Sequence, residues 1–345
     1  LYKGNNQYVK ATGSNGAYTF SGYQTTATEF ALNASGNFSI SNLPSGSYRV
    51  VEIKWDSYNY NPKTTYVDIT VENGKNTPVN FENIRTGYVL VKKNWTIPVG
   101  LDRSTKRITD LTKNTYFLIR DKSTNQYLTA TTDNQSRYTY TGVTTKANAT
   151  KFNAYVYIEN NDISSISFSV NKLPLGNYVV EEITTGDANK YFIPDKTSID
   201  ITLTNAVPTN DSSFTNTEKG CATINKVWSD AGTGYATDAE RNAVTFYIRN
   251  KATNVYIKAS GSAGDYTFTG LGTTAISSGT GFKLSSSNTF LVKDLDAGTY
   301  IVSEVLAGSS KFAPRDEQEV TVANGEANGV TFQNVVKAGA LKVNK

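Results

Sequence analysis

The sequence predicts an all-β protein built from related domains in tandem. Its 345 residues include 22 Tyr and only 8 Pro and are also rich in Thr, Val and Asn, a composition typical of strands joined by polar turns. The sequence lacks long amphipathic helical patterns. Three short motifs also recur along the chain in a fixed order, at intervals that match the size of a domain with its own core. We therefore expect about three domains.

The first motif, G-x-x-x-[VI]-x-K, predicts the opening strand of a domain. It occurs at residues 87–93 and 220–226, and the same spacing recurs at 339–345. Successive side chains of a strand point to opposite faces, so Lys93 shares a face with Val91. We therefore expect the lysines of this motif to point into the domain cores.

The second motif, L-x-x-G-x-Y-x-V-x-E, predicts a tight turn that leads into a central strand. Its glycine supplies the backbone freedom that such a turn needs. Within the strand, Glu182 is in phase with Tyr178 and Val180, and a proline after each such strand marks its end. The motif ends at Glu52, Glu182 and Glu304. These carboxyl groups are expected to face inward.

The third motif, F-x-N, predicts the last strand of a domain, with its asparagine in phase with the preceding phenylalanine. It ends at Asn83, Asn216 and Asn334. Two domains therefore direct an amine, a carboxyl and an amide into one core. The complete sets are Lys93, Glu182, Asn216 and Lys226, Glu304, Asn334, whereas Glu52 and Asn83 have no matching lysine before them.

Burial of these groups has a chemical consequence. Desolvation disfavours charge, so a buried lysine tends toward the neutral amine and a buried glutamate toward the protonated acid. A neutral amine is a nucleophile, and a protonated carboxyl can polarise an amide and transfer protons. Attack on the asparagine amide would release ammonia and leave an uncharged isopeptide bond, and the fold would supply the proximity.

The motifs resemble the Cna-B-type domains of Gram-positive surface adhesins and sortase-assembled pilins. The matching stretches are residues 87–93, 173–182 and 214–216, with equivalents in the third domain. The resemblance implies tandem immunoglobulin-like or transthyretin-like β-sandwiches arranged end to end. It also implies bonds from Lys93 to Asn216 and from Lys226 to Asn334, with Glu182, Glu304 and Glu52 in the catalytic position.

The function implied is that of a structural subunit of a Gram-positive pilus shaft or cell-surface stalk, rigidified by these bonds. Such a chain would be extracellular, attached to the cell wall or assembled into a pilus, and its self-directed, single-turnover chemistry would not make it an enzyme. The alternative function is that of an adhesin module that binds a host matrix protein or glycan through tyrosines and Thr-rich loops. No sequence feature localises such a binding site.

The motif positions also predict domain boundaries. The expected segments are an incomplete domain at 1–86, full domains at 87–219 and 220–338, and a further first strand at 339–345. Truncation of a longer tandem array is the simpler interpretation of the two ends. The alternative is head-to-tail assembly of identical subunits, in which the last strand of one chain is donated to the next and places Lys345 near Glu52 and Asn83.

Composition argues against several other classes of protein. The chain contains no His, so His-based catalytic triads and His-ligated metals are excluded, and its acidic pairs are too irregular for calcium; we expect no metal or cofactor. The net charge of +4 is spread out, which argues against nucleic acid, and no apolar run is long enough to insert into a membrane. The single cysteine, Cys221, is out of phase with Ala222 and Ile224 and is expected to be a partly exposed thiol; a thioester with a glutamine has no supporting motif.

Overall fold

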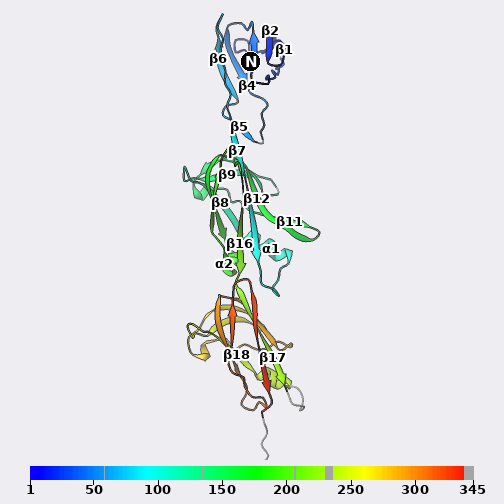
Figure 1. Cartoon of the computed structure of the whole chain (residues 1–345), viewed down its shortest axis with the longest axis vertical. Coiled ribbons are helices and arrows are strands. Elements are labelled where there is room, and N and C mark those ends of the chain that lie inside the picture. Colours follow the sequence, from blue (N-terminus) through cyan, green and yellow to red (C-terminus); the bar gives the residue numbers. More distant parts are fainter. Residues whose placement is uncertain (58, 134, 206, 230–235, 338–345) are drawn as a thin grey trace, which may run out of the picture. The chain divides into compact units, whose positions relative to one another are not determined.

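The computed structural model describes residues 1–57, 59–133, 135–205, 207–229 and 236–337 and consists mostly of strands (Figure 1). Contacts divide the chain into two compact units. One comprises Leu1–Val89, Val170–Asn177 and Thr202–Asn210, and the other comprises Leu90–Ser169, Tyr178–Ile201 and Asp211–Lys345. The strand predicted at 339–345, with Lys345, lies outside the described residues. The expected fold class, tandem all-β sandwich domains, is confirmed, whereas the domain boundaries drawn from the motifs stay a prediction.

The third domain is a sandwich of a five-stranded and a three-stranded sheet. The first sheet has the order β19 (Ile257–Ser262), β20 (Asp265–Leu271), β21 (Thr289–Leu295), β17 (Gly220–Ser229) and β24 (Ala327–Val335). The second has the order β18 (Thr245–Asn250), β22 (Gly298–Val305) and β23 (Gln318–Val322). Phe246, Phe290 and Phe332 are fully buried where residues from both sheets meet, and the ring centroid of Phe246 is 5.3 Å from that of each of the other two. Burial of such rings stabilises the sandwich.

The second domain repeats this strand order within one continuous sheet. The order is β14 (Phe192–Pro194), β16 (Thr209–Glu218), β7 (Asn83–Thr96), β12 (Asp162–Pro174), β10 (Arg137–Thr144), β9 (Tyr127–Thr132), β8 (Thr115–Asp121), β13 (Gly176–Thr184) and β15 (Ser198–Leu203). A pairing of Arg120 with Tyr127 joins β8 to β9 and so makes the sheet continuous. The short strand β11 (Tyr155–Glu159) pairs with β12.

The first domain contains smaller sheets whose strands follow the same order as the matching strands of the third domain. One has the order β1 (Tyr8–Ser14), β2 (Ala17–Gln24) and β3 (Ser39–Ser41), another joins β4 (Gly46–Val51) to β6 (Tyr66–Val71), and β5 (Tyr60–Pro62) pairs with the beginning of β7. Tyr2 bridges Tyr48 as Asp121 pairs with Tyr178 in the second domain. Leu1 therefore occupies the place of Arg120.

The backbone conformation explains why one position of each repeat is a glycine. In the recurring Tyr-Thr-aromatic-Ser/Thr-Gly stretch, the glycines Gly22, Gly142 and Gly270 have φ angles of 135°, 158° and 149°. Next to them the strand register shifts, as between Tyr140 and Gly142. A bulge of this kind needs a backbone conformation that residues with a Cβ rarely adopt, so the repeat retains glycine there.

Short helices interrupt the strands, and the sequence patterns did not predict them. They are α1 (Thr105–Lys113), α2 (Gly186–Tyr191) and α3 (Asp238–Ala243), with 3-10 turns at Lys146–Asn148 and Ile276–Ser278. The Ser104 side chain caps α1 by accepting a hydrogen bond from the backbone N–H of Arg107. Ile108 and Leu111 then pack against Phe192, which fastens the helix to the core. In the described parts of the chain, no helix has the length and apolar character needed to cross a membrane.

A buried aspartate in the third domain leads to a stability prediction. Asp294 occupies the turn position of Asn42 and Lys172, and all three have a φ near 60°. Burial, together with the nearby Glu218 carboxylate, raises the pKa of Asp294 to about 6. Since the folded pKa lies above the ordinary value of 3.8, the charged form disfavours folding, and this penalty is complete above pH 6 and absent well below pH 4.

Asp294→Asn is therefore expected to stabilise the third domain at pH 7.5 by about 1–3 kcal/mol, because it removes the buried charge and suits the left-handed backbone. The gain should disappear at pH 3.5. Urea denaturation at the two pH values measures both effects, and equal midpoints for the variant and the parent at pH 7.5 would contradict the prediction.

Candidate cross-linking sites

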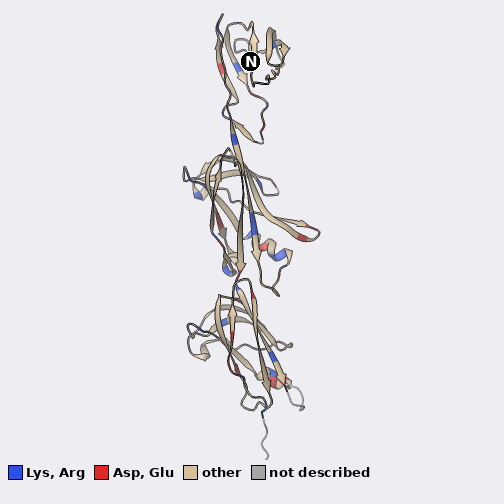
Figure 2. Cartoon of the chain, in the orientation of Figure 1, with Lys and Arg blue, Asp and Glu red and all other residues tan. Residues whose placement is uncertain are grey.

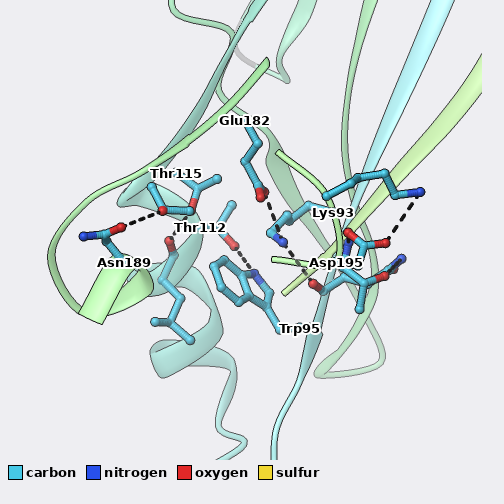
Figure 3. A network of polar contacts seen from close by, with 12 residues as sticks. Lys93, Trp95, Thr112, Thr115, Glu182, Asn189 and Asp195 are labelled. Atoms are coloured by element: carbon cyan, nitrogen blue, oxygen red, sulfur yellow. Dashed lines mark hydrogen bonds and ion pairs between the residues drawn. The ribbon is translucent and has the colours of Figure 1, made fainter. Parts of the chain in front are cut away.

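The second domain brings Lys93, Glu182 and Asn216 together, as the motifs predicted. Lys93 lies on β7, Glu182 on β13 and Asn216 on β16, and all three are buried. Lys93 Nζ is 3.1 Å from Glu182 Oε1, and both side chains are almost completely inaccessible to solvent. Figure 3 shows the Glu182 carboxyl pointing at the Lys93 amine, with Trp95 beside it. The side-chain amide of Asn216 makes no hydrogen bond of ordinary geometry within the described residues, but it lies close enough to the Glu182 carboxyl to affect its pKa.

The third domain brings Lys226, Glu304 and Asn334 together in the same way. On the parallel strands β17 and β24, Lys226 pairs with Phe332, so Asn334 lies two residues further along the same face. Lys226 Nζ is 3.5 Å from Glu304 Oε1, and Asn334 Nδ2 donates a hydrogen bond of 2.7 Å to Glu304 Oε2. Both ionisable side chains are fully buried. The carboxyl therefore touches both the amine and the amide.

Burial shifts the pKa values of both lysines and of Glu182 in the direction that cross-linking needs. Desolvation lowers the pKa of Lys93 to about 8 against the opposing charge of Glu182, and lowers that of Lys226 to about 8 against Glu304. Desolvation raises the pKa of Glu182 while Lys93 and the Asn216 amide oppose the change. Near neutral pH each of these lysines is therefore an uncharged amine, the nucleophilic form, more often than an exposed lysine is.

Two further residues complete each site, and the motifs did not single them out for this role. A tryptophan two residues after each lysine covers its amine: Lys93 Nζ is 4.3 Å from the Trp95 ring centroid and Lys226 Nζ is 4.0 Å from that of Trp228. Alternation along the strand puts each tryptophan on the same face as its lysine, but the contact depends on the side-chain rotamers. The proline after each glutamate strand lies opposite the asparagine, as in the pairing of Pro194 with Asn216. Sequence reasoning assigned this proline only to the end of a strand.

The first domain holds the remaining pair. Asn83 Nδ2 donates a hydrogen bond of 2.9 Å to Glu52 Oε1, which matches the Asn334–Glu304 contact. Glu52 Oε2 and Asn83 Oδ1 are buried without hydrogen-bond partners in the described part of the chain. The structure thus brings Glu52 and Asn83 together as predicted, and Lys345, the suggested partner, lies outside the described residues.

The expectation of a partly exposed Cys221 thiol is wrong. Cys221 is completely buried, and burial, followed by the nearby Glu218 carboxylate, raises the pKa of its thiol to about 11. The segment before β24 covers this part of β17, since Cys221 N–H donates to Glu326 O and a Cβ on Gly220 would meet Ala323 O at 2.3 Å. Alternation along a strand separates two faces but does not show that the second face is open. The thiol is thus held in its unreactive protonated form.

Charged residues of both signs are interspersed along the described chain (Figure 2). Exposed ion pairs account for many of them, including Lys92 with Asp211 and Lys251 with Glu319. Lys92 is exposed, as expected for the residue next to Lys93, whereas Glu181 is only partly exposed and binds Arg120, Lys146 and the Tyr127 hydroxyl. Glu181 therefore has a structural role on the outer face of the sheet.

Comparison with known families supports the resemblance inferred from the motifs. Residues 1–85 match the family model of the SpaA prealbumin-like fold domain. The matched segment contains the Glu52–Asn83 pair, and the second and third domains repeat its motifs and its strand order.

Several solved structures are similar to the chain at low identity. The shaft pilin SpaA of Lactobacillus rhamnosus GG is 15% identical over 74% of this chain and 100% of that protein, with a TM-score of 0.32. The minor pilin GBS52 of Streptococcus agalactiae is 15% identical over 75% of this chain and 100% of that protein, with a TM-score of 0.27. The Bacillus anthracis TIE protein is 17% identical over 85% of this chain and 43% of that protein, with a TM-score of 0.29. No curated protein matched the chain. The similarity to the SpaA prealbumin-like family therefore rests on the sequence match of residues 1–85.

Proposed function

We propose that this chain is a structural subunit of a Gram-positive pilus shaft or surface stalk whose second and third domains each close an internal Lys–Asn isopeptide bond. The observation that carries the proposal is the recurrence of one buried arrangement, in which a lysine amine, a glutamate carboxyl and an asparagine amide lie close together in two domains. The SpaA-type match of residues 1–85 supports the pilus role. Identical subunits are the partners that such a role implies.

The proposed reaction starts from the neutral lysine amine and the protonated glutamate. Lys226 Nζ attacks Asn334 Cγ, and the bond between Cγ and Nδ2 breaks. Glu304, which touches Nδ2 at 2.7 Å, delivers the proton that the departing nitrogen needs and recovers one from the attacking amine. One ammonia leaves for each bond formed, and the carboxyl ends as it began. Lys93, Glu182 and Asn216 would react in the same manner.

The reaction also removes a cost that the unreacted fold carries. A buried lysine and a buried glutamate lose several kcal/mol of hydration each, which their mutual attraction only partly offsets. In the product, the lysine nitrogen belongs to a neutral amide that is suited to an apolar core. Each set reacts once and is consumed, so the proposal describes self-assembly rather than turnover of a substrate.

Intact-mass measurement of the folded chain tests the proposal. The expected result is a deficit of two ammonia molecules, with peptide mapping that joins Lys93 to Asn216 and Lys226 to Asn334. Lys92→Arg, at the exposed neighbour of Lys93, is a matched control and should keep the full deficit. A folded chain with its full mass would overturn the proposed cross-links.

A further inference from the structure

The residue that follows the proline of each site differs in charge from domain to domain. Pro62 and Pro194 lie opposite Asn83 and Asn216. In the third domain, Phe312 bridges Val336 and Ala313 N–H donates to Val335 O, which puts Pro314 opposite Asn334. The next residue is Lys63, Asp195 or Arg315. In each domain a proline thus lies opposite the asparagine of the site, and a different ionisable residue follows that proline.

In the second domain, backbone contacts hold Asp195 beside the site. Asp195 N–H donates to Thr215 O, and Thr215 N–H donates to Asp195 Oδ1 at 3.0 Å, next to Asn216. Figure 3 shows Asp195 beside Lys93. The Asp195 carboxylate opposes the lowering of the Lys93 pKa and adds to the raising of the Glu182 pKa. Lys196 Nζ is 3.5 Å from Asp195 Oδ2 and partly offsets this charge.

In the third domain, the equivalent residue is a cation. Arg315 N–H donates a hydrogen bond of 3.3 Å to Glu304 Oε2, so its backbone touches the reacting carboxyl. Its guanidinium adds to the lowering of the Lys226 pKa. Other groups around Lys226 Nζ are Glu304, the carbonyls of Val227 and Phe332 and the Trp228 ring. Lys93 Nζ has the corresponding surroundings in Glu182, Asn94 O and Trp95.

We propose that the charge on the residue after the proline sets the pH range in which each domain cross-links, with Asp195 moving the range of the second domain upward and Arg315 moving that of the third domain downward. The inference rests on the proposed function, because it concerns the same reaction. Asp195 and Arg315 are positioning residues in this scheme, since their side chains act on the reacting groups through space.

The direction in which each charge shifts the pH range follows from the protonation states of the lysine and the glutamate that react. The reaction needs a neutral lysine and a protonated glutamate, so a plot of the cross-linking rate against pH should be bell-shaped. Because the two groups interact, its rising and falling sides report pKa values of the pair and not of either residue alone. A nearby negative charge favours the protonated form of both groups and shifts both limbs to higher pH, and a positive charge does the reverse. Asp195 and Arg315 are exposed residues, so salt should weaken the effect.

Refolding experiments test this inference. The chain is purified in urea with its full mass, diluted into buffers from about pH 5 to pH 10, and sampled by peptide mapping for each bond separately. Asp195→Arg should lower the pH optimum for the Lys93–Asn216 bond by about half a pH unit, and Arg315→Asp should raise that for Lys226–Asn334 by a similar amount, less than the one to three units of a charge in direct contact. Each variant should leave the other domain unchanged, and high salt should reduce both shifts.

Two further comparisons keep the test decisive. The neutral variants Asp195→Asn and Arg315→Gln should give smaller shifts in the same directions, and they disturb the fold least. Lys63→Asp, at the equivalent position of the first domain, should move neither optimum. Bonds that form with unchanged optima in the charge-reversed and neutral variants would overturn the inference and leave the proposed function standing. A parent chain that loses no ammonia at any pH would overturn both.

Discussion

Glu182→Gln is expected to abolish the Lys93–Asn216 bond while the third domain still forms its own. The substitution keeps the shape of the side chain but removes the acid that transfers protons between the amine and the departing ammonia. The intact mass should then show a deficit of one ammonia instead of two. The lost bond closes a loop of about 120 residues, for which chain entropy predicts a stabilisation of about 5 kcal/mol, so the second domain should unfold at clearly lower temperature.

Glu304→Gln is the matched control, because it makes the same change in the third domain. It should also leave a deficit of one ammonia, with the bond retained between Lys93 and Asn216. Peptide mapping distinguishes the two variants and calorimetry reports which domain loses stability. A Glu182→Gln chain that still loses two ammonia molecules would show that this glutamate is dispensable and would contradict the assigned role.

Arg107→Met is expected to destabilise the second domain by about 3–5 kcal/mol for a reason unrelated to cross-linking. Arg107, on α1, binds the Glu218 carboxylate through both terminal nitrogens, and the Glu218 side chain is only 2% exposed. Loss of the arginine leaves a buried carboxylate without its cation, which costs more than the net contribution of the intact pair. Urea denaturation of the variant measures the loss.

The double variant Arg107→Met with Glu218→Met supplies the control for this prediction. Replacement of both partners by apolar side chains removes the orphaned charge, so most of the lost stability should return. If the double variant is as unstable as Arg107→Met, the loss comes from the packing of α1 rather than from the carboxylate. Both chains should retain the ammonia deficit of the parent.

Alternation along strands was sufficient to place the ionisable groups. Lys93 and Glu182 were predicted to face inward because apolar residues lie two positions away, and both are buried. The repeats helped further, since the same three residue types recur in a second complete set. This agreement shows that a period of two is reliable where one strand face is continuously apolar. The role of the sites in cross-linking stays a prediction.

Other features could not be predicted from the sequence because they depend on contacts with residues that are distant along the chain. Cys221 is buried by the segment before β24, which pattern analysis of β17 alone does not reveal. The helix α1 is too short for a periodic signal, and its buried residues pack against Phe192, far along the chain. The proximity of Asp195 to Lys93 likewise requires the pairing of β14 with β16 to be known.

The parallel pairing of β17 and β24 determines how the third domain would respond to traction. Their register runs from Cys221 opposite Ala327 to Ser229 opposite Val335, so the chain enters and leaves the pair at opposite ends. A pull on the two termini of the domain therefore shears the whole ladder at once, instead of opening its hydrogen bonds one by one. With Lys226 joined to Asn334, tension would pass directly from β17 to the end of β24, and the residues between them would bear no load.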